Sequence, residues 1–146
     1  KLETALQNTS SVNLIGKTVE SYGNTINHAE NATETISYSL PSDAESIQID
    51  IFDSTGNQID MVRVGSQTQG KNMATWDGAN SQGKPVSAGT YSYAVKAENL
   101  AGAPIQVDTF SSGLVSDVVF GEDETYAVVN GKEIPINTIK RVSQTN

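Results

Sequence analysis

Cysteine is absent from this 146-residue sequence, and histidine is nearly so. Without cysteine the chain forms no disulfide and no thiolate metal site. The single histidine, His28, lies in a polar stretch that we expect to be a linker. One histidine in such a place supports neither a catalytic triad nor a multi-histidine metal site. We therefore predict no bound metal and no cofactor.

Positive charge is also scarce. The chain has 9 lysines and arginines against 17 aspartates and glutamates, for a net charge of −8. A nucleic-acid surface needs clustered basic residues that displace counterions from phosphates, and an anionic membrane surface attracts basic rather than acidic proteins. No apolar run reaches the roughly 18 residues of a membrane-spanning helix. We therefore expect no nucleic-acid partner and no membrane insertion.

Two common catalytic signatures are missing as well. The sequence has no Gly-x-Ser-x-Gly nucleophile elbow and no Gly-Lys-Ser/Thr phosphate loop. Residues 122–124 form an acidic cluster, but they lack the apolar flank that general-acid catalysis needs, and we interpret them as a solvated turn. We therefore expect that the protein is not an enzyme.

The sequence does contain a series of short alternating strands between residues 35 and 110. Ile47, Ile49 and Ile51 alternate with polar residues, which places the three isoleucines on one face of a strand. About seven such strands, separated by glycine and proline turns, are typical of an immunoglobulin-like sandwich. Because the Cys-Trp-Cys pattern of antibody domains is absent, we predict an Ig/fibronectin III-like sandwich over residues 33–109.

Shorter β segments precede this sandwich. Residues 14–26 are predicted to form a hairpin that turns at Gly23-Asn24, and residues 27–34 are predicted to be a linker. Residues 1–13 are polar and weakly patterned, so we expect a helical or disordered lead-in there.

Similar segments follow the sandwich. Asn130-Gly131 is the strongest hairpin turn in the chain, and Ile139 with Val142 is predicted to form a last strand. We therefore predict a second, discontinuous β unit over residues 14–32 and 110–146. The two ends of an inserted domain normally lie close together, so we expect the sandwich to enter and leave at neighbouring points.

The stretch from Trp76 to Tyr91 carries the clearest local signal. An EF-hand calcium loop would need an oxygen ligand at its third position, where this sequence has Ala79, and a late glutamate that is also missing. A structural turn explains the pattern better, because the Asp77 side chain can bond backbone amides ahead of it and glycine adopts dihedrals that other residues resist. The residues that we assign to this structural motif, and not to an active site, are Trp76, Asp77, Gly78, Gly83, Ala88, Gly89 and Tyr91.

The spacing Trp76-Asp77-Gly78-x-Asn80-x-x-Gly83-x-x-Val86-x-Ala88-Gly89-x-Tyr91 resembles the Ig-like module of the bacterial flagellar hook-capping family. This family is also described as basal-body rod modification or hook assembly scaffold proteins. The motif alone is shared with Ig-like modules of other bacterial secreted proteins. The flanking segments narrow the resemblance, because Leu14-Ile15-Gly16-Lys17-x-Val19 and Gly113-x-Val115-x-x-Val118 resemble the two halves of that family's tudor-like barrel.

The resemblance implies an all-β fold in which a fibronectin III/Ig-like sandwich is inserted into a split tudor-like (SH3-like) small β-barrel. Gly16, Lys17 and Gly113 join the structural motif on this basis. It also implies a non-catalytic scaffold at the distal end of the growing hook, which promotes polymerisation of exported hook subunits. The implied location is extracellular, at the hook tip, after export through the flagellar type III pathway.

The implied partners are hook subunits and other copies of the chain in a homo-oligomeric cap. The flagellar export apparatus is a further implied partner, through an N-terminal region that we expect to be missing, because the sequence begins at Lys1 without a methionine. Exposed edge strands are the contact surfaces that we expect, since an open edge can pair with a strand of a partner.

Two other functions remain as alternatives. A carbohydrate-binding or adhesive Ig-like module would need exposed, stacked aromatic side chains, whereas Trp76, Tyr91 and Tyr93 are expected in the core. A tudor-type reader of peptides or nucleic acid would need an aromatic cage or a basic groove, which the composition disfavours.

Overall fold

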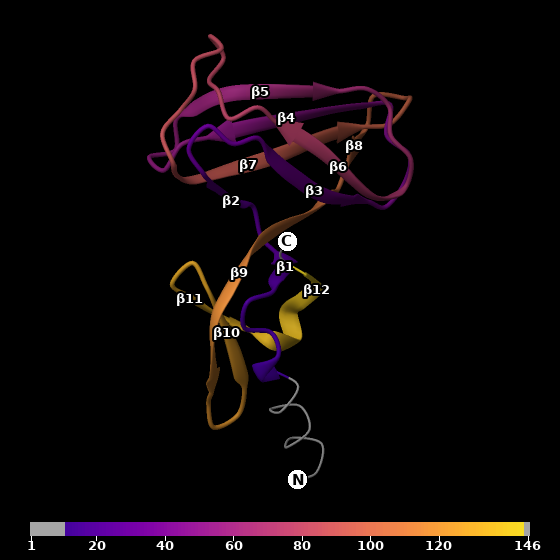
Figure 1. Ribbon diagram of the computed structural model, residues 1–146. Helices are drawn as coiled ribbons and strands as arrows, with labels where there is room; N and C mark the ends of the chain where they lie inside the picture. Colours follow the sequence, from indigo (N-terminus) through magenta and orange to yellow (C-terminus); the bar gives the residue numbers. More distant parts are fainter. Residues whose placement is uncertain (1–10, 145–146) are drawn as a thin grey trace. The chain divides into compact units, whose positions relative to one another are not determined.

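The computed structural model describes residues 11–144 (Figure 1). Most of these residues form β-strands, and the segments with alternating apolar and polar residues are among them. The strands divide between two compact units. Gly23–Ser111 form one unit, and the described residues up to Tyr22 together with those from Ser112 onward form the other. The predicted fold class, an all-β chain with a sandwich inserted into a small barrel-like unit, is confirmed. The predicted lead-in over residues 1–13 lies mostly outside the described residues.

Two antiparallel sheets make up the sandwich unit. One sheet has the order β2-β7-β4-β5, with β8 paired to β7, and the other joins β6 to β3 and β3 to the first residues of β9. The bounds of these strands are β2 (Thr25–His28), β3 (Glu34–Leu40), β4 (Ser46–Phe52), β5 (Gln58–Val64), β6 (Gly70–Trp76), β7 (Gly89–Glu98), β8 (Pro104–Ile105) and β9 (Asp108–Phe120).

The sandwich core follows from the period-two pattern of its strands. Ile47, Ile49 and Ile51 of β4 are buried on one face, as predicted, and Tyr38 and Leu40 of β3 face them from the other sheet. Each fully buried isoleucine of this kind contributes about 1.5–3 kcal/mol relative to an exposed one. The hydrophobic effect therefore holds the two sheets together without any disulfide.

The other unit is a half-barrel of five strands in the order β11-β10-β9-β1-β12. Its remaining elements are β1 (Thr18–Tyr22), β10 (Thr125–Val129), β11 (Lys132–Pro135), the 3-10 turn η1 (Ile136–Thr138) and β12 (Ile139–Ser143). The buried core of this unit is small and consists of Val19, Val115, Ala127 and Val129. The predicted Asn130-Gly131 hairpin turn is present, with φ of 54° and 79° at its two residues.

The predicted hairpin over residues 14–26 is wrong. β1 pairs with β12 and lies beside β9, whereas β2 pairs with β7 of the sandwich. The backbone groups at Gly23-Asn24 are bonded to other strands, since the Gly23 N–H donates to the Thr109 carbonyl and the Asn24 carbonyl accepts the Tyr93 N–H. The predicted linker over residues 27–34 is shortened accordingly, because residues 27 and 28 complete β2 and Glu34 begins β3.

The two points at which the chain enters and leaves the sandwich lie side by side, as expected for an inserted domain. The Gly23 N–H donates to the Thr109 carbonyl at 3.1 Å. The Thr25 N–H and hydroxyl both donate to the Ser111 hydroxyl oxygen, at 2.8 and 2.9 Å. A Cβ at Gly23 would lie 2.6 Å from that same oxygen, so only glycine permits this close approach.

Candidate functional site

Trp76 anchors the loop of residues 77–88 to the sandwich core. Its side chain is 0% exposed at the end of β6. The indole Nε1–H donates to the Ala79 carbonyl at 2.9 Å and to Asp60 Oδ2 at 3.1 Å. The Asp77 carboxylate accepts the Ala79 N–H at 3.0 Å, which is the type of turn contact that the sequence predicts. Through these contacts Trp76 and Asp77 stabilise the conformation of the loop.

His28 is buried against this tryptophan, so the prediction that it lies in a polar linker is wrong. The imidazole ring lies 5.0 Å from the Trp76 ring and 5.7 Å from the Tyr91 ring, between centroids. Its Nδ1 is 2.8 Å from the Glu34 carboxylate, which also accepts the Ala29 N–H. The alternation of β2 places His28 inward together with Ile26. The two-residue spacing of Ile26 and His28 is the sequence signal that the linker prediction overlooked.

Gly78 lets the loop pass directly over this histidine. It has a φ of 75°, and a Cβ there would lie 2.4 Å from the Ala32 carbonyl oxygen and 2.6 Å from His28 Cε1. Gly83 has a similar φ of 79° but no atom within 4 Å of the equivalent position. The two motif glycines therefore have different roles. A side chain at Gly78 would clash with its neighbours, whereas at Gly83 only the backbone conformation favours glycine.

Three loops of the sandwich share one five-residue design that sequence analysis did not recognise. In residues 53–57, 80–84 and 99–103 the first residue is Asp or Asn, and its Oδ1 accepts the N–H groups of the third and fifth residues. Backbone hydrogen bonds close each loop, and a glycine with positive φ stands fourth. The pattern Asx-x-x-Gly-x in the sequence is the signal that could have found them.

In the half-barrel, the motif residues set the start of β1 against β9. The Gly16 N–H donates to the Val115 carbonyl, and the Val115 N–H donates to the Lys17 carbonyl, both at 2.9 Å. A Cβ at Gly113 would lie 2.3 Å from Val129 Cγ1, so the hairpin partner β10 can approach only glycine here. The assignment of the motif as purely structural stays a prediction, as does its separation from partner contacts.

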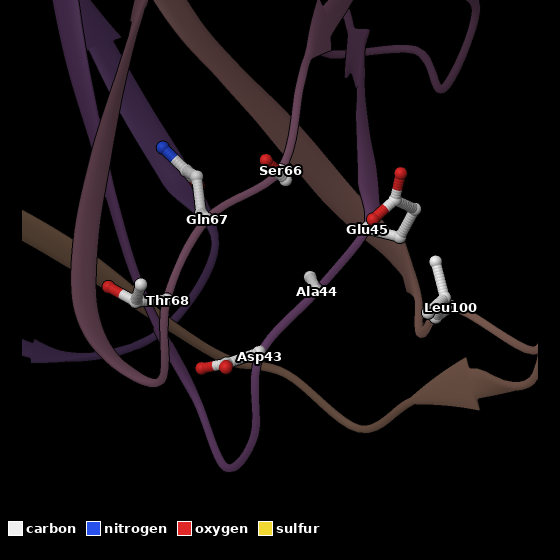
Figure 2. Close-up of a pocket in the computed structure, with 7 residues that line it drawn as sticks. All are labelled: Asp43, Ala44, Glu45, Ser66, Gln67, Thr68 and Leu100. Carbon is white, nitrogen blue, oxygen red and sulfur yellow. The ribbon is translucent and has the colours of Figure 1, made fainter.

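A pocket of about 430 Å³ lies at the end of the sandwich where β3, β5 and β7 finish (Figure 2). Three chain segments line it, and its residues are Asp43, Ala44, Glu45, Ser66, Gln67, Thr68 and Leu100. Two backbone hydrogen bonds between Ala44 and Gln67 join two of these segments, and the Asp43 carboxylate accepts the Gln69 N–H at 2.8 Å. Sequence analysis did not predict this pocket, because its residues come from loops that are far apart in the chain.

The Tyr38 hydroxyl connects the core to this pocket, because it donates to Gln67 Oε1. Burial raises the pKa of the Tyr38 phenol, and the Gln67 hydrogen bond offsets part of that rise. A raised pKa in the folded state means that stability is full below the ordinary tyrosine pKa of about 10 and declines as pH rises above it, because the unfolded chain ionises first.

We therefore expect alkaline pH to destabilise the wild-type sandwich more than a Tyr38→Phe variant, in which this ionisation is removed. Urea unfolding from about pH 8 to about pH 11 measures the effect. The two proteins share all other tyrosines and lysines, so these groups act as an internal control. Parallel pH profiles for the two proteins would contradict the expected role of Tyr38.

Each sheet of the sandwich has one long strand with a single partner. Among the described strands, β5 pairs only with β4, and β6 pairs only with β3. The exposed methionines Met61 and Met73, which are 39% and 59% exposed, lie on these two strands. The loop at residues 80–84 covers part of β5, because the Ser81 N–H donates to the Ile59 carbonyl. The remaining edges are of the kind that can accept a partner strand.

The titratable side chains of the described residues do not gather into a metal-binding group. Residues 11–144 contain no group of three or more His, Cys, Asp or Glu side chains placed to hold a metal ion. The acidic residues 122–124 lie at the exposed β9–β10 turn. No described helix is long and apolar enough to cross a membrane.

Comparison with known proteins gives a consistent result. The model of the FlgD Ig-like domain family matches residues 23–101. The solved structure of FlgD from Xanthomonas campestris, described for its hook capping in flagellar assembly, is 23% identical and has a TM-score of 0.81, with 94% of this chain and 99% of that chain covered. FlgD from P. aeruginosa is 21% identical with a TM-score of 0.80, covering 89% and 98%.

A truncated FlgD from Helicobacter pylori is 21% identical and has a TM-score of 0.53, with 92% of this chain and 97% of that chain covered. No curated protein matches the chain. The agreement in fold therefore extends beyond the sandwich and includes the half-barrel, since most of each chain is superposed.

Proposed function

Because the match over residues 23–101 makes this chain a member of the FlgD Ig-like domain family, we propose that it is a non-catalytic scaffold that caps the growing flagellar hook and promotes polymerisation of hook subunits. The observation that carries this proposal is the family match together with a fold that follows the hook-capping FlgD of Xanthomonas campestris over 94% of the chain. The proposed partners are hook subunits, further copies of the chain and, through a more N-terminal region, the export apparatus. The proposed location is the extracellular tip of the hook, reached through the flagellar type III pathway.

The described surface supports a binding role of this kind. A cap must hold and release subunits repeatedly, so its contacts should be modest in size rather than permanent. The sandwich offers open edges at β5 and β6, and strand addition to an open edge provides main-chain hydrogen bonds without a deep pocket. We propose these edges as contacts for incoming hook subunits.

The glycan-binding alternative receives no support from the sandwich. None of the aromatic side chains in residues 23–111 is exposed, and Trp76, Tyr91 and Tyr93 are all buried. Sugar rings bind by stacking on exposed aromatic faces, so a stacking platform would have to form from residues that now hold the core together.

Deleting the gene should leave cells without hooks, while hook protein accumulates in the culture medium. Export continues in such cells, but the subunits leave the channel without a scaffold to retain and order them. Electron microscopy of the cell surface and immunoblotting of the medium measure the two outcomes. Normal hooks in the deletion strain would overturn the proposed function.

Complementation of the deletion strain separates the proposed edge contacts from the rest of the protein. The wild-type gene should restore hooks, and a Met61→Lys, Met73→Lys variant should restore fewer, because a charged lysine on an edge strand opposes strand addition. Both positions are exposed, so the variant should unfold at nearly the wild-type urea concentration. Full complementation by this variant would show that the edges of β5 and β6 are not contacts.

A further inference from the structure

Leu100 stands out when the three Asx loops are compared with one another. It is the second residue of the loop 99–103 and is 85% exposed. The second residues of the other two loops are Ser54 and Ser81. Those loops close the same side-chain and backbone hydrogen bonds with serine, so the loop design does not require a leucine. The loop fold therefore leaves Leu100 free for another role, and its place in the lining of the pocket connects it to a contact surface.

The pocket beside Leu100 has a negative charge that is available for a partner. Glu45 and Asp43 are its two charged lining residues, and no lining residue is basic. The Asp43 carboxylate already accepts the Gln69 N–H. Glu45 is exposed, and none of the described residues forms a hydrogen bond or an ion pair with its carboxylate. A chemically matching occupant therefore has an ammonium or guanidinium group at the end of an apolar stem.

The chain itself carries such a group on a loop at the other end of the sandwich. Lys84 is the fifth residue of the Asx loop 80–84, and it is exposed. The loop joins the end of β6 to the start of β7, whereas the pocket lies where β7 ends, and Figure 1 shows this loop rising from the end of the sandwich opposite β8. No ion pair or ring contact involves the Lys84 ammonium within residues 11–144.

The loop that carries Lys84 is also preorganised. Asn80 Oδ1 accepts the N–H groups of Gln82 and Lys84, each at 3.0 Å, and the Asn80 N–H donates to the Lys84 carbonyl at 2.9 Å. The Ser81 N–H ties the loop to β5 through the Ile59 carbonyl. A rigid loop loses little conformational entropy when it binds, which favours a contact made by a single projecting side chain.

We propose that the pocket of Asp43, Glu45 and Leu100 receives Lys84 from a second copy of this chain. The ammonium would lie against the Glu45 carboxylate, and Leu100 would cover the aliphatic stem. In an end-to-end arrangement the pocket of one sandwich meets the lysine end of the next, so copies join head to tail and close into a ring if the angle between them permits. This inference rests on the proposed cap, in which several copies act together.

Single contacts of this kind should be weak. An exposed ion pair contributes little stability, so assembly would depend on several contacts in one ring and on the local concentration at the hook tip. Weak individual contacts suit a cap that must hold and release subunits repeatedly. The test must therefore capture transient neighbours rather than rely on a stable dimer in dilute solution.

Because the sequence contains no cysteine, introduced cysteines are the only thiols that a cross-linker can join. A Gln82→Cys protein mixed with a Ser66→Cys protein should form a covalent dimer when treated with a short bifunctional maleimide, because Gln82 is exposed on the loop of Lys84 and Ser66 is exposed in the lining of the pocket, so both charges of the contact stay in place. The matched control is Ser54→Cys mixed with Ser66→Cys, because Ser54 is exposed on an Asx loop at the same end of the sandwich as Lys84. We expect about tenfold more dimer from the first pair, because a specific contact raises the effective concentration of the two thiols. Equal yields from the two pairs would overturn the proposal.

Charge reversal provides the second measurement. Lys84→Glu and Glu45→Lys should each reduce self-association in sedimentation experiments at high protein concentration, and the double variant should recover it. Leu100→Ser should also reduce association without loss of stability, because serine occupies this position in the two sister loops. Unchanged association in all these variants would reject the contact, as would a double variant that fails to recover. Neither result bears on the hook-capping proposal, which fails only if the deletion strain builds hooks.

Discussion

Replacing Trp76 with alanine should lower the free energy of unfolding by about 3–5 kcal/mol, the range found when a large buried aromatic side chain is truncated. Trp76 is 0% exposed, and its ring centroid lies 5.3 Å from that of Tyr91 and 5.0 Å from that of His28. The substitution leaves a cavity among these rings and removes the donor that Ala79 and Asp60 share. Urea denaturation, followed by circular dichroism, measures the loss.

A Trp76→Phe variant separates the two parts of this effect. Phenylalanine keeps much of the apolar volume but lacks the indole N–H, so it should cost about 1–3 kcal/mol, mainly from the buried acceptors that lose their donor. We expect any loss of hook assembly in these variants to follow the fraction of unfolded protein. A Trp76→Ala protein that is fully folded but inactive would show that the loop is a contact surface and would contradict the structural assignment.

Gly78→Ala should destabilise the protein much more than Gly83→Ala, although both glycines have nearly the same positive φ. At Gly83 the expected cost is about 1–2 kcal/mol, from holding an alanine in the left-handed region alone. At Gly78 the same strain is joined by a clash with the Ala32 carbonyl oxygen and with His28, and overpacking of this kind adds about 1–3 kcal/mol.

The comparison of these two variants isolates the packing of the loop over His28. Thermal unfolding of wild type, Gly78→Ala and Gly83→Ala under one buffer condition is sufficient. The larger loss at Gly78 should be accompanied by a change in tryptophan fluorescence, because Trp76 packs against the histidine that must move. Equal losses at the two positions would mean that the loop shifts easily and that the close approach has no energetic consequence.

Local patterns predicted the sandwich well because each strand carries its own signal. The alternation of Ile47, Ile49 and Ile51 predicts which face of the strand is buried, and Asn130-Gly131 predicts where a hairpin turns. Neither inference needs knowledge of which strand lies beside which. The return of similar short segments after residue 110 then indicated the insertion of one unit into the other, and the family resemblance supplied the fold of each unit.

Pairing between distant strands could not be read from the sequence. Gly23-Asn24 looks like a hairpin turn, but β2 finds its partner in β7, more than sixty residues later along the chain. The boundary of the sandwich therefore falls after Tyr22 rather than after residue 32. His28 was misplaced for the same reason, because its burial depends on Trp76 and Tyr91, which reach it only in the folded chain.

The pocket illustrates a different limit. Its lining residues belong to three loops, and no single loop has a motif that would indicate a binding site. The Asx-x-x-Gly-x repeat was visible in the sequence, and aligning its three copies would have singled out Leu100 as the exception. What the sequence could not supply was the neighbourhood of Leu100, since Asp43 and Glu45 precede it by more than fifty positions.

The hydrogen bonds at Gly23, Thr25, Thr109 and Ser111 hold the two ends of the sandwich side by side. Its entry and exit are bonded to each other. We therefore expect that the sandwich can be deleted and Tyr22 joined to Ser112 through a short turn without stretching the half-barrel. Modules bounded in this way can be exchanged between relatives as single pieces, because the host unit experiences only the two adjacent ends. Variation in the surface that the sandwich presents can therefore accumulate while the half-barrel that carries it is preserved.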